Sequence, residues 1–324
     1  MRAGPMRWLF VSLLALAASA FAQDFPARQI TLIVPFAPNG PPDTLARLLA
    51  DAMSNDLKQP VVIENVAGAG GTVGATRVAK APNDGYTLLV NHVGQAVAPA
   101  LYPKLAYDPI ADFQPIGRIA DVPMTLVGRG NLPPRDLKEL IAWIRANGKK
   151  VNFAHAGRGA VSQLCGLLLE KALGVKMTPV AYKGTGPAMT DLLSYQIDLM
   201  CDQTTNTATL IRSGQIKVYA VTTKKRLESM KDVPTFAESG YPSIEITAWH
   251  GLFAPKGTPK PVVDRLASAL QAALKDPVFT TRLGDLGAVP ATQAEATPAA
   301  LQALMKSEVA RWTPIIKAAG GAQE

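Results

Sequence analysis

The chain has 324 residues, enough for two domains of ordinary size, and its 48% hydrophobic content excludes a largely disordered protein. The formal net charge is +8, but the basic residues are scattered, with no Lys/Arg block and no interleaved aromatic residues. This distribution argues against nucleic acid as a partner.

Residues 1–22 have the pattern of a secretory signal peptide. Arg2 and Arg7 give a positive start, Trp8–Ala18 is a short apolar run, and residues 20–22 form an A-x-A cleavage site. The apolar run is too short to span a bilayer, and every later stretch of spanning length contains charges or prolines. We therefore expect a soluble, exported protein, whose formal charge falls from +8 to +6 when the two arginines are removed.

The first unit after this segment is a strand, a turn and a helix. Ile30–Val34 is a β-rich apolar run, and apolar residues recur at helical spacing between residues 45 and 53. Pro38–Gly40 is a turn signal, and Asp43 is a candidate N-cap. Such a helix N-terminus presents unpaired N–H groups and the positive end of the helix dipole to an anion. The alternative is an ordinary corner without a ligand.

The rest of the chain alternates between strand and helix patterns. This alternation predicts a mainly parallel sheet covered on both faces. Pro314 lies inside the last expected helix and predicts a kink or break there. Strands are expected at residues 61–64, 86–90, 122–129, 151–154, 178–182, 197–201, 217–222 and 244–254, and helices at residues 72–80, 134–147, 160–173, 186–195, 205–213, 261–275, 277–286 and 298–318.

Two extended segments, at about residues 122–129 and 244–254, enclose a self-contained αβ series. This order predicts two α/β lobes joined by two crossings. Lobe 1 is expected to comprise residues 23–123 and 247–324, and lobe 2 residues 124–246.

The two cysteines, Cys165 and Cys201, lie in apolar settings, in an expected helix and at the end of an expected strand. We expect two buried free thiols, although an exported compartment also permits a disulfide.

Five segments in this order and spacing carry a family resemblance: ITLIVPFAPNGPPDTLARLLA, VVIENVAGAGGTVGATRVAKAPNDGYTLL, PALYPKLAYDPIADF, VAYKGTGPAMTDLL and GLFAPKGTPKPVVDRL. The chain resembles the substrate-binding receptors of tripartite tricarboxylate transporters, the Bug family. The resemblance implies an α/β, two-lobed periplasmic binding protein of type II with two crossing strands. It implies a monomeric receptor, without catalysis or cofactor, that closes on a small organic acid and delivers it to a membrane permease.

The resemblance assigns the ligand loop of the first lobe to residues 36–40. The usual motif has two glycines, so Asn39 departs from it, although asparagine tolerates left-handed backbone well. The residues expected to contact the ligand here are Phe36, Ala37, Pro38, Asn39 and Gly40.

The loop of the second lobe corresponds to residues 155–161. The family more often has hydroxyl residues where Ala160 and Val161 stand, so two side-chain donors are missing. Arg158 either donates a forked pair of hydrogen bonds to a distal carboxylate of the ligand or is a solvated loop arginine. The candidate ligand-binding residues are His155, Gly157, Arg158, Gly159, Ala160 and Val161.

Five further residues are placed near the cleft. Asn91, His92 and Gln95 follow a strand end, where ligands of open α/β sheets bind. Asp202 matches an acidic position of the family that faces a ligand amine or hydroxyl, or it caps the next helix. Tyr182 is expected to form a wall of the pocket.

Three functions compete: a carboxylate receptor, a receptor that signals to a partner protein, and an exported hydrolase. A hydrolase needs a nucleophile, a base and an orienting acid. The sequence has three histidines, His92, His155 and His250, far apart, and no G-x-S-x-G motif. A metal site is equally unsupported. We therefore expect a binding protein, not an enzyme.

Overall fold

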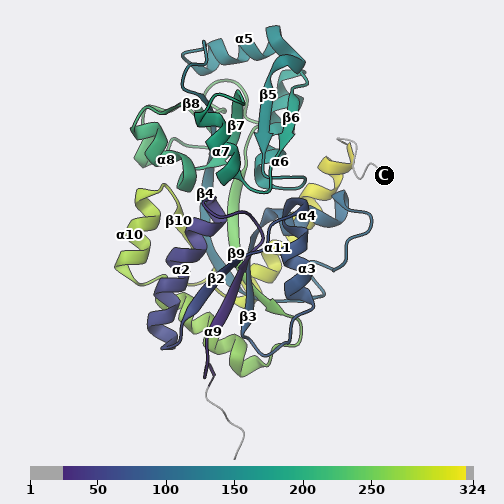
Figure 1. Ribbon diagram of the computed structural model, residues 1–324, viewed down its shortest axis with the longest axis vertical. Coiled ribbons are helices and arrows are strands. Elements are labelled where there is room, and N and C mark those ends of the chain that lie inside the picture. Colours follow the sequence, from purple (N-terminus) through teal and green to yellow (C-terminus); the bar gives the residue numbers. More distant parts are fainter. Residues whose placement is uncertain (1–24, 319–324) are drawn as a thin grey trace, which may run out of the picture.

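The computed structural model describes residues 25–318, so the expected signal peptide lies outside the described residues. The chain forms two α/β lobes, one above the other in Figure 1. One path of paired strands runs through both lobes in the order β2-β1-β3-β9-β4-β7-β5-β6. Within residues 25–318, no helix is long and apolar enough to cross a bilayer.

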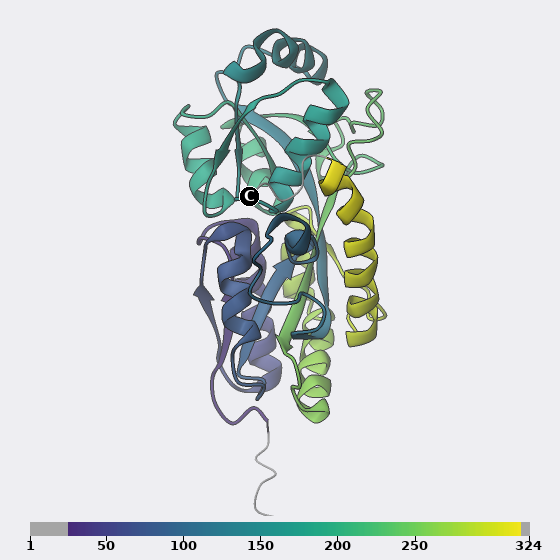
Figure 2. The same ribbon diagram turned by 90° about the vertical axis from the view of Figure 1, so that its right-hand side faces the viewer.

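The first lobe contains both ends of the described chain. Strand β1 pairs parallel with β2 and with β3, and β3 pairs antiparallel with β9. The strands are β1 (Ile30–Val34), β2 (Val61–Asn65), β3 (Thr87–His92), β9 (Thr247–Pro255) and β10 (Val289–Pro290), and the helices are α2 (Pro41–Leu57), η1 (Ala69–Gly71), α3 (Thr72–Ala79), α4 (Val93–Leu101), α9 (Lys260–Ala273), α10 (Pro277–Asp285) and α11 (Pro298–Ala318). Figure 2 shows α11 running along one side of this lobe toward the second lobe.

The second lobe repeats the arrangement around a smaller sheet. Strands β5, β6 and β7 are parallel, whereas β7 and β8 pair antiparallel with the end of β4. Its strands are β5 (Asn152–His155), β6 (Thr178–Ala181), β7 (Leu199–Gln203) and β8 (Ile216–Val221), and its helices are α5 (Leu137–Asn147), η2 (Gly148–Lys150), α6 (Val161–Leu173), α7 (Thr185–Leu193), α8 (Thr204–Arg212) and η3 (Glu228–Met230).

The long strand β4 (Phe113–Arg129) belongs to both sheets. It pairs with β9 as far as Pro123 and with β7 from Met124 onward. We therefore propose the lobe boundaries at residues 123/124 and, where the chain returns ahead of β9, at 246/247. We expected a mainly parallel sheet, but the observed sheet is mixed. The strands that cross between the lobes, β4 and β9, pair antiparallel with their neighbours, and antiparallel pairs need no crossover helix.

One local expectation was wrong, and of the kink or break expected at Pro314 the break does not occur. Helix α2 begins at Pro41 after Gly40, so Asp43 lies in the first turn and is not the N-cap. Helix α11 continues beyond Pro314 without a break. A proline removes only one hydrogen bond of a 21-residue helix, and packing of Trp312 and Ile316, both 2% exposed, supports that end.

The expectation of free thiols was also wrong, because Cys165 and Cys201 form a disulfide. Their Cα atoms lie 6.1 Å apart, within the usual range for a bridge. The bond joins α6 to β7, two elements whose ends meet at the cleft.

A candidate binding site between the lobes

A small cavity lies where the two lobes meet. Its volume is about 10 Å³, room for roughly one water molecule. The lobes are therefore closed in this structure and must separate before an organic acid can enter. The cavity is lined by Phe36, Gly40, Pro42, His92, Ala156, Ala160, Val161, Ser162, Thr185, Asp202 and Gln203.

Helix N-termini converge on this cavity. Helix α6 begins after Ala160, α7 after Gly184 and α8 after Gln203, and residues from each of these starts line the cavity. The first N–H groups of a helix lack partners inside the helix, and they carry the positive end of its dipole. Three such ends from one lobe can hold an anion without a basic side chain.

Helix α2, by contrast, contributes little to an anion site. Its first two helical residues, Pro41 and Pro42, have no N–H group. The first turn also carries the carboxylate of Asp43, which is 2% exposed. The sequence indicated the N-terminus of α2 as an anion site, but of the four helix N-termini it is the least suited to bind an anion.

Asp43 instead fixes the first-lobe loop. It accepts hydrogen bonds of 3.0 Å from the N–H of Asn39, 3.0 Å from both Arg47 Nε and Nη2, and 2.9 Å from Asn65 Nδ2. Asn65 Nδ2 also donates to the carbonyl oxygen of Phe36 at 3.1 Å. Burial alone would raise the pKa of Asp43, but these bonds outweigh it and lower the pKa.

The middle of this loop contacts α7 and not the cavity. The N–H of Ala37 donates to the carbonyl oxygen of Lys183 at 3.0 Å. A Cβ atom on Gly186 would lie 2.6 Å from the carbonyl oxygen of Pro38, so this approach requires glycine. Pro38 and Asn39 are exposed, with Asn39 at φ 62°. We expected Ala37, Pro38 and Asn39 to contact the ligand; they lie against Lys183 and the start of α7.

The second-lobe loop contacts the first lobe outside the cavity. Tyr102 Oη donates to the carbonyl oxygen of Arg158 at 2.8 Å. A Cβ atom on Gly70 would overlap the same carbonyl oxygen, and Gly157 lies against Gly70. Gly159 packs near Leu101. Gly157, Arg158 and Gly159 therefore connect the closed lobes, and none of them lines the cavity.

His92 is the predicted strand-end residue that reaches the cavity. Its Nδ1 accepts from the N–H of Gly94 at 2.9 Å, so the neutral ring carries its proton on Nε2. The ring stacks on Phe36 with centroids 5.0 Å apart. Burial lowers the pKa of His92 to about 4, so the ring is uncharged at neutral pH. Asn91 and Gln95 bond to each other at 2.7 Å and lie outside the cavity lining.

Asp202 is the one carboxylate among the described residues that line the cavity. It accepts from the N–H of Gln203 at 2.8 Å, from Asn206 Nδ2 at 2.5 Å and from the side chain of Thr185. Burial raises the pKa of Asp202 to about 6, although these bonds oppose the rise. The N-cap of α8 is Gln203, so Asp202 stands one residue before the cap, against the capping alternative, and it lines the cavity.

Ser162 supplies a hydroxyl that the sequence analysis missed. Its Oγ accepts from the N–H of Ala156 at 3.0 Å, which leaves the hydroxyl proton for another acceptor. The family resemblance directed attention to positions 160 and 161; the hydroxyl stands one residue later, in the first turn of α6. Pro42, Ala156, Thr185 and Gln203 also line the cavity and were not predicted.

Two predicted residues point elsewhere. His155 Nδ1 accepts from the N–H of Gly157 at 3.1 Å, burial lowers its pKa, and the ring lines a separate cavity beside Gln163. Tyr182 Oη donates to Asp191 at 2.6 Å. The predicted residues that share the interlobe cavity are Phe36, Gly40, His92, Ala160, Val161 and Asp202.

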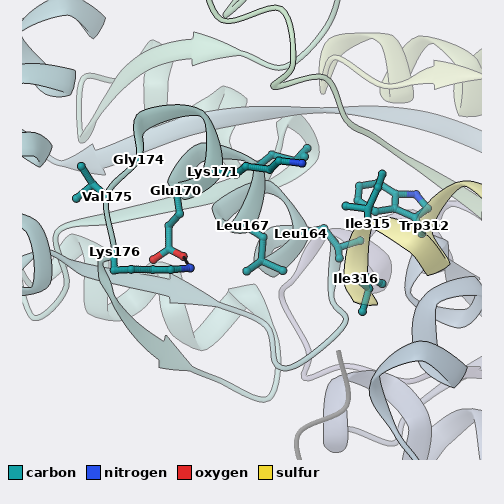
Figure 3. A pocket seen from close by; sticks show the side chains of 11 residues that line it. Leu164, Leu167, Glu170, Lys171, Gly174, Val175, Lys176, Trp312, Ile315 and Ile316 are labelled. Carbon is teal, nitrogen blue, oxygen red and sulfur yellow. Dashed lines mark hydrogen bonds and ion pairs between the residues drawn. The ribbon is translucent and has the colours of Figure 1, made fainter. Parts of the chain in front are cut away.

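A larger cavity, of about 380 Å³, lies between α6 and the end of α11. Figure 3 shows Trp312, Ile315 and Ile316 on one side of it and Leu164 and Leu167 on the other. Two of its lining residues, the exposed Lys176 and the largely buried Glu170, pair with each other at 2.8 Å. No helix begins among the described residues that line it, whereas the starts of α6, α7 and α8 meet at the smaller interlobe cavity.

We compared the sequence with models of protein families and the structure with solved structures, and both comparisons identify the family of this chain. The profile described as "Tripartite tricarboxylate transporter family receptor" matches residues 45–321. Among solved structures, the periplasmic binding protein BugD is 50% identical, with a TM-score of 0.91, covering 93% of this chain and 100% of that one. MatC from Rhodopseudomonas palustris with bound malate is 44% identical, with a TM-score of 0.87, covering 90% and 100%. Rpa4515 from R. palustris with adipate is 35% identical, with a TM-score of 0.87, covering 92% and 99%. The expected fold class is thereby confirmed, and the chain belongs to the receptor family of tripartite tricarboxylate transporters.

Proposed function

We propose that this protein is exported to the periplasm by residues 1–22, binds a small organic acid between its lobes, and delivers it to a tripartite tricarboxylate-type membrane permease. The observation that carries the proposal is the convergence of the starts of α6, α7 and α8 on one interlobe cavity. One chain supplies both walls of this cavity, which supports action as a monomer.

The lining suits a carboxylate bound through neutral donors. Among the described residues that line it there is no lysine or arginine. The available donors are helix N–H groups, the hydroxyl of Ser162 and Nε2 of His92, and hydrogen bonds from such groups to a charged acceptor are strong. The malate and adipate bound to relatives support a dicarboxylate as the ligand class for this chain.

Hydrolysis is a poorer fit, although Ser162, His92 and Asp202 share the cavity. In a triad, the histidine accepts from the serine and donates to the acid through its other nitrogen. Here His92 Nδ1 accepts from Gly94, and Asp202 accepts from Gln203, Asn206 and Thr185. A histidine with a pKa of about 4 is also a weak base at neutral pH. Across residues 25–318 no group of acidic, histidine or cysteine side chains could hold a metal ion.

A thermal-shift screen of mono-, di- and tricarboxylates tests the proposal. A ligand at 100 times its dissociation constant adds about 2.7 kcal/mol to the free energy of unfolding, a readily measured change. We expect at least one dicarboxylate to stabilise the protein and calorimetry to give one site per chain. Absence of any stabilisation across the panel, or turnover of ester substrates that is lost in Ser162→Ala, would refute the receptor function.

A further inference from the structure

The larger cavity between α6 and the end of α11, called the α6–α11 cavity below, is not used by the proposed function. Its volume of about 380 Å³ falls within the usual range of ligand pockets, about 300–1,000 Å³. Leu164, Trp312 and Ile316 line it and are only 0%, 2% and 2% exposed, so the site is a hollow and not a flat face. A small molecule can enter such a hollow, whereas the surface of a protein partner cannot reach its floor.

The walls of this cavity are apolar and come from both lobes. Leu167 and Leu168 lie on α6 of the second lobe, and Trp312 and Ile315 lie on α11 of the first. An apolar chain between these walls would gain up to about fourfold in affinity for each CH₂ group that it buries. Because separation of the lobes moves one wall away from the other, a molecule that contacts both walls stabilises the closed state.

One cation at the cavity lacks a partner. Lys176 and Glu170 pair with each other at 2.8 Å, so their charges are matched. The ammonium group of Lys171 forms no ion pair or hydrogen bond with any described residue. Figure 3 shows the Lys171 side chain extending toward Ile315 and away from Gly174, where α6 ends. The cavity therefore combines an apolar interior with one unmatched positive charge.

We propose that the α6–α11 cavity is a second binding site, for an amphipathic monocarboxylic acid whose carboxylate pairs with Lys171 and whose aliphatic chain lies between α6 and α11. The site goes beyond the proposed function, because its ligand is bound mainly through an apolar chain and lies outside the interlobe cavity. Since this ligand contacts both lobes, it acts as an effector that favours closure. By linkage, it and the acid between the lobes strengthen each other's binding by the same factor.

An acid fits this site better than other amphipathic molecules. A cationic head group is repelled by Lys171, and a neutral head group leaves its charge unmatched. An exposed ion pair adds only up to about fivefold to the affinity. The apolar chain therefore supplies most of the affinity, and Lys171 selects the head group.

Calorimetry of the purified protein with hexanoate, octanoate and octanol tests the site. Octanoate should bind about tenfold more tightly than hexanoate, because it buries two further CH₂ groups. It should bind about threefold more tightly than octanol, which has no charge to pair with Lys171. Absence of octanoate binding, or equal affinity for octanoate and octanol, would overturn the proposal and leave the receptor function standing.

Variants then locate the bound octanoate. Lys171→Glu should weaken its binding at least about fivefold, and Lys149→Glu, at an exposed lysine of the same lobe outside the cavity, should keep the wild-type affinity. Leu168→Gln places a polar group in the apolar wall and should also weaken binding, whereas Leu210→Gln, at a half-buried leucine outside the cavity, should not. Weakening in Ser162→Ala without weakening in Lys171→Glu would place octanoate between the lobes and overturn the proposal.

Small-angle scattering tests the effector role and the alternative occupant. Saturating octanoate, with no other acid present, should reduce the radius of gyration of the wild type. An unchanged radius would show that the occupant does not favour closure. Association of the unliganded protein into dimers that Leu168→Gln abolishes would assign the cavity to a second copy of the chain and overturn the proposal.

Discussion

The N–H of Ala37 in the first lobe donates a 3.0 Å hydrogen bond to the carbonyl oxygen of Lys183 in the second. A second bond between the lobes, 2.8 Å from Tyr102 Oη to the carbonyl oxygen of Arg158, lies at the other loop. Both acceptors are main-chain atoms, so substitution of the Lys183 or Arg158 side chain leaves them in place. The closed state therefore depends on how closely the two backbones approach, and glycines permit that approach at both contacts.

Gly70→Ala should weaken ligand binding by preventing full closure. The added Cβ atom would overlap the carbonyl oxygen of Arg158, so the two loops must stay apart. We expect at least about a tenfold loss of affinity, or about 1.4 kcal/mol, measured by calorimetry. Small-angle scattering should show a larger radius of gyration in the presence of ligand than for the wild type.

Gly174→Ala is the matched control for backbone strain. Gly70 and Gly174 have similar positive φ angles, 62° and 66°, but a Cβ atom on Gly174 would meet nothing within 4 Å. Both variants should lose roughly 1 kcal/mol of stability from the left-handed backbone. Only Gly70→Ala should lose affinity; equal affinity in the two variants would show that this contact does not control closure.

Ser162→Ala should reduce affinity for the acid by about 1.5–3 kcal/mol, the range for a hydrogen bond to a charged group. The Oγ accepts from Ala156, so its proton remains for the ligand. Asn39→Ala should change affinity little, because Asn39 is exposed and bonds to Asp43 only through its backbone N–H. The exposed Ser213→Ala is a control for serine removal. Calorimetry on the three variants with one acid separates them, and an unaltered Ser162→Ala would exclude the hydroxyl as a donor.

The sequence predicted the order of elements well and the site only in part, for physical reasons. Alternation of apolar runs depends on local burial, so it identified most strands and helices within a few residues. Which residues of a loop face the cleft depends on the packing of whole lobes, so Ala37, Pro38 and Asn39 were expected at the ligand, whereas they contact Lys183 and the start of α7. Likewise, a separation of 36 residues between Cys165 and Cys201 carries no information about distance in the fold.

Loss of the disulfide should destabilise the protein. Closing a loop between residues 36 apart removes unfolded-state entropy worth about 4 kcal/mol at 25 °C in the chain-entropy model. The Cys165→Ala/Cys201→Ala double variant should therefore unfold at a lower urea concentration than the oxidised wild type. Thiol titration of the denatured wild type should find no free thiol; two free thiols would contradict the bond.

The last prediction concerns the pH dependence of stability, through Asp202. Its pKa is about 6 in the folded protein, above the ordinary value of 3.8, because burial disfavours the charged form. Between these values the folded protein binds the proton and the unfolded chain releases it, so stability falls as pH rises from about 3.8 to about 6. Two pKa units correspond to an upper limit of about 3 kcal/mol. Asp202→Asn has no proton to release, so the difference in unfolding free energy, variant minus wild type, should grow across this range and level off above it. Urea unfolding of both proteins without ligand, at intervals from pH 3.5 to pH 8, measures this difference, and Asp191→Asn is the control. If the unfolding free energies of variant and wild type changed in parallel with pH, burial would not raise the pKa of Asp202.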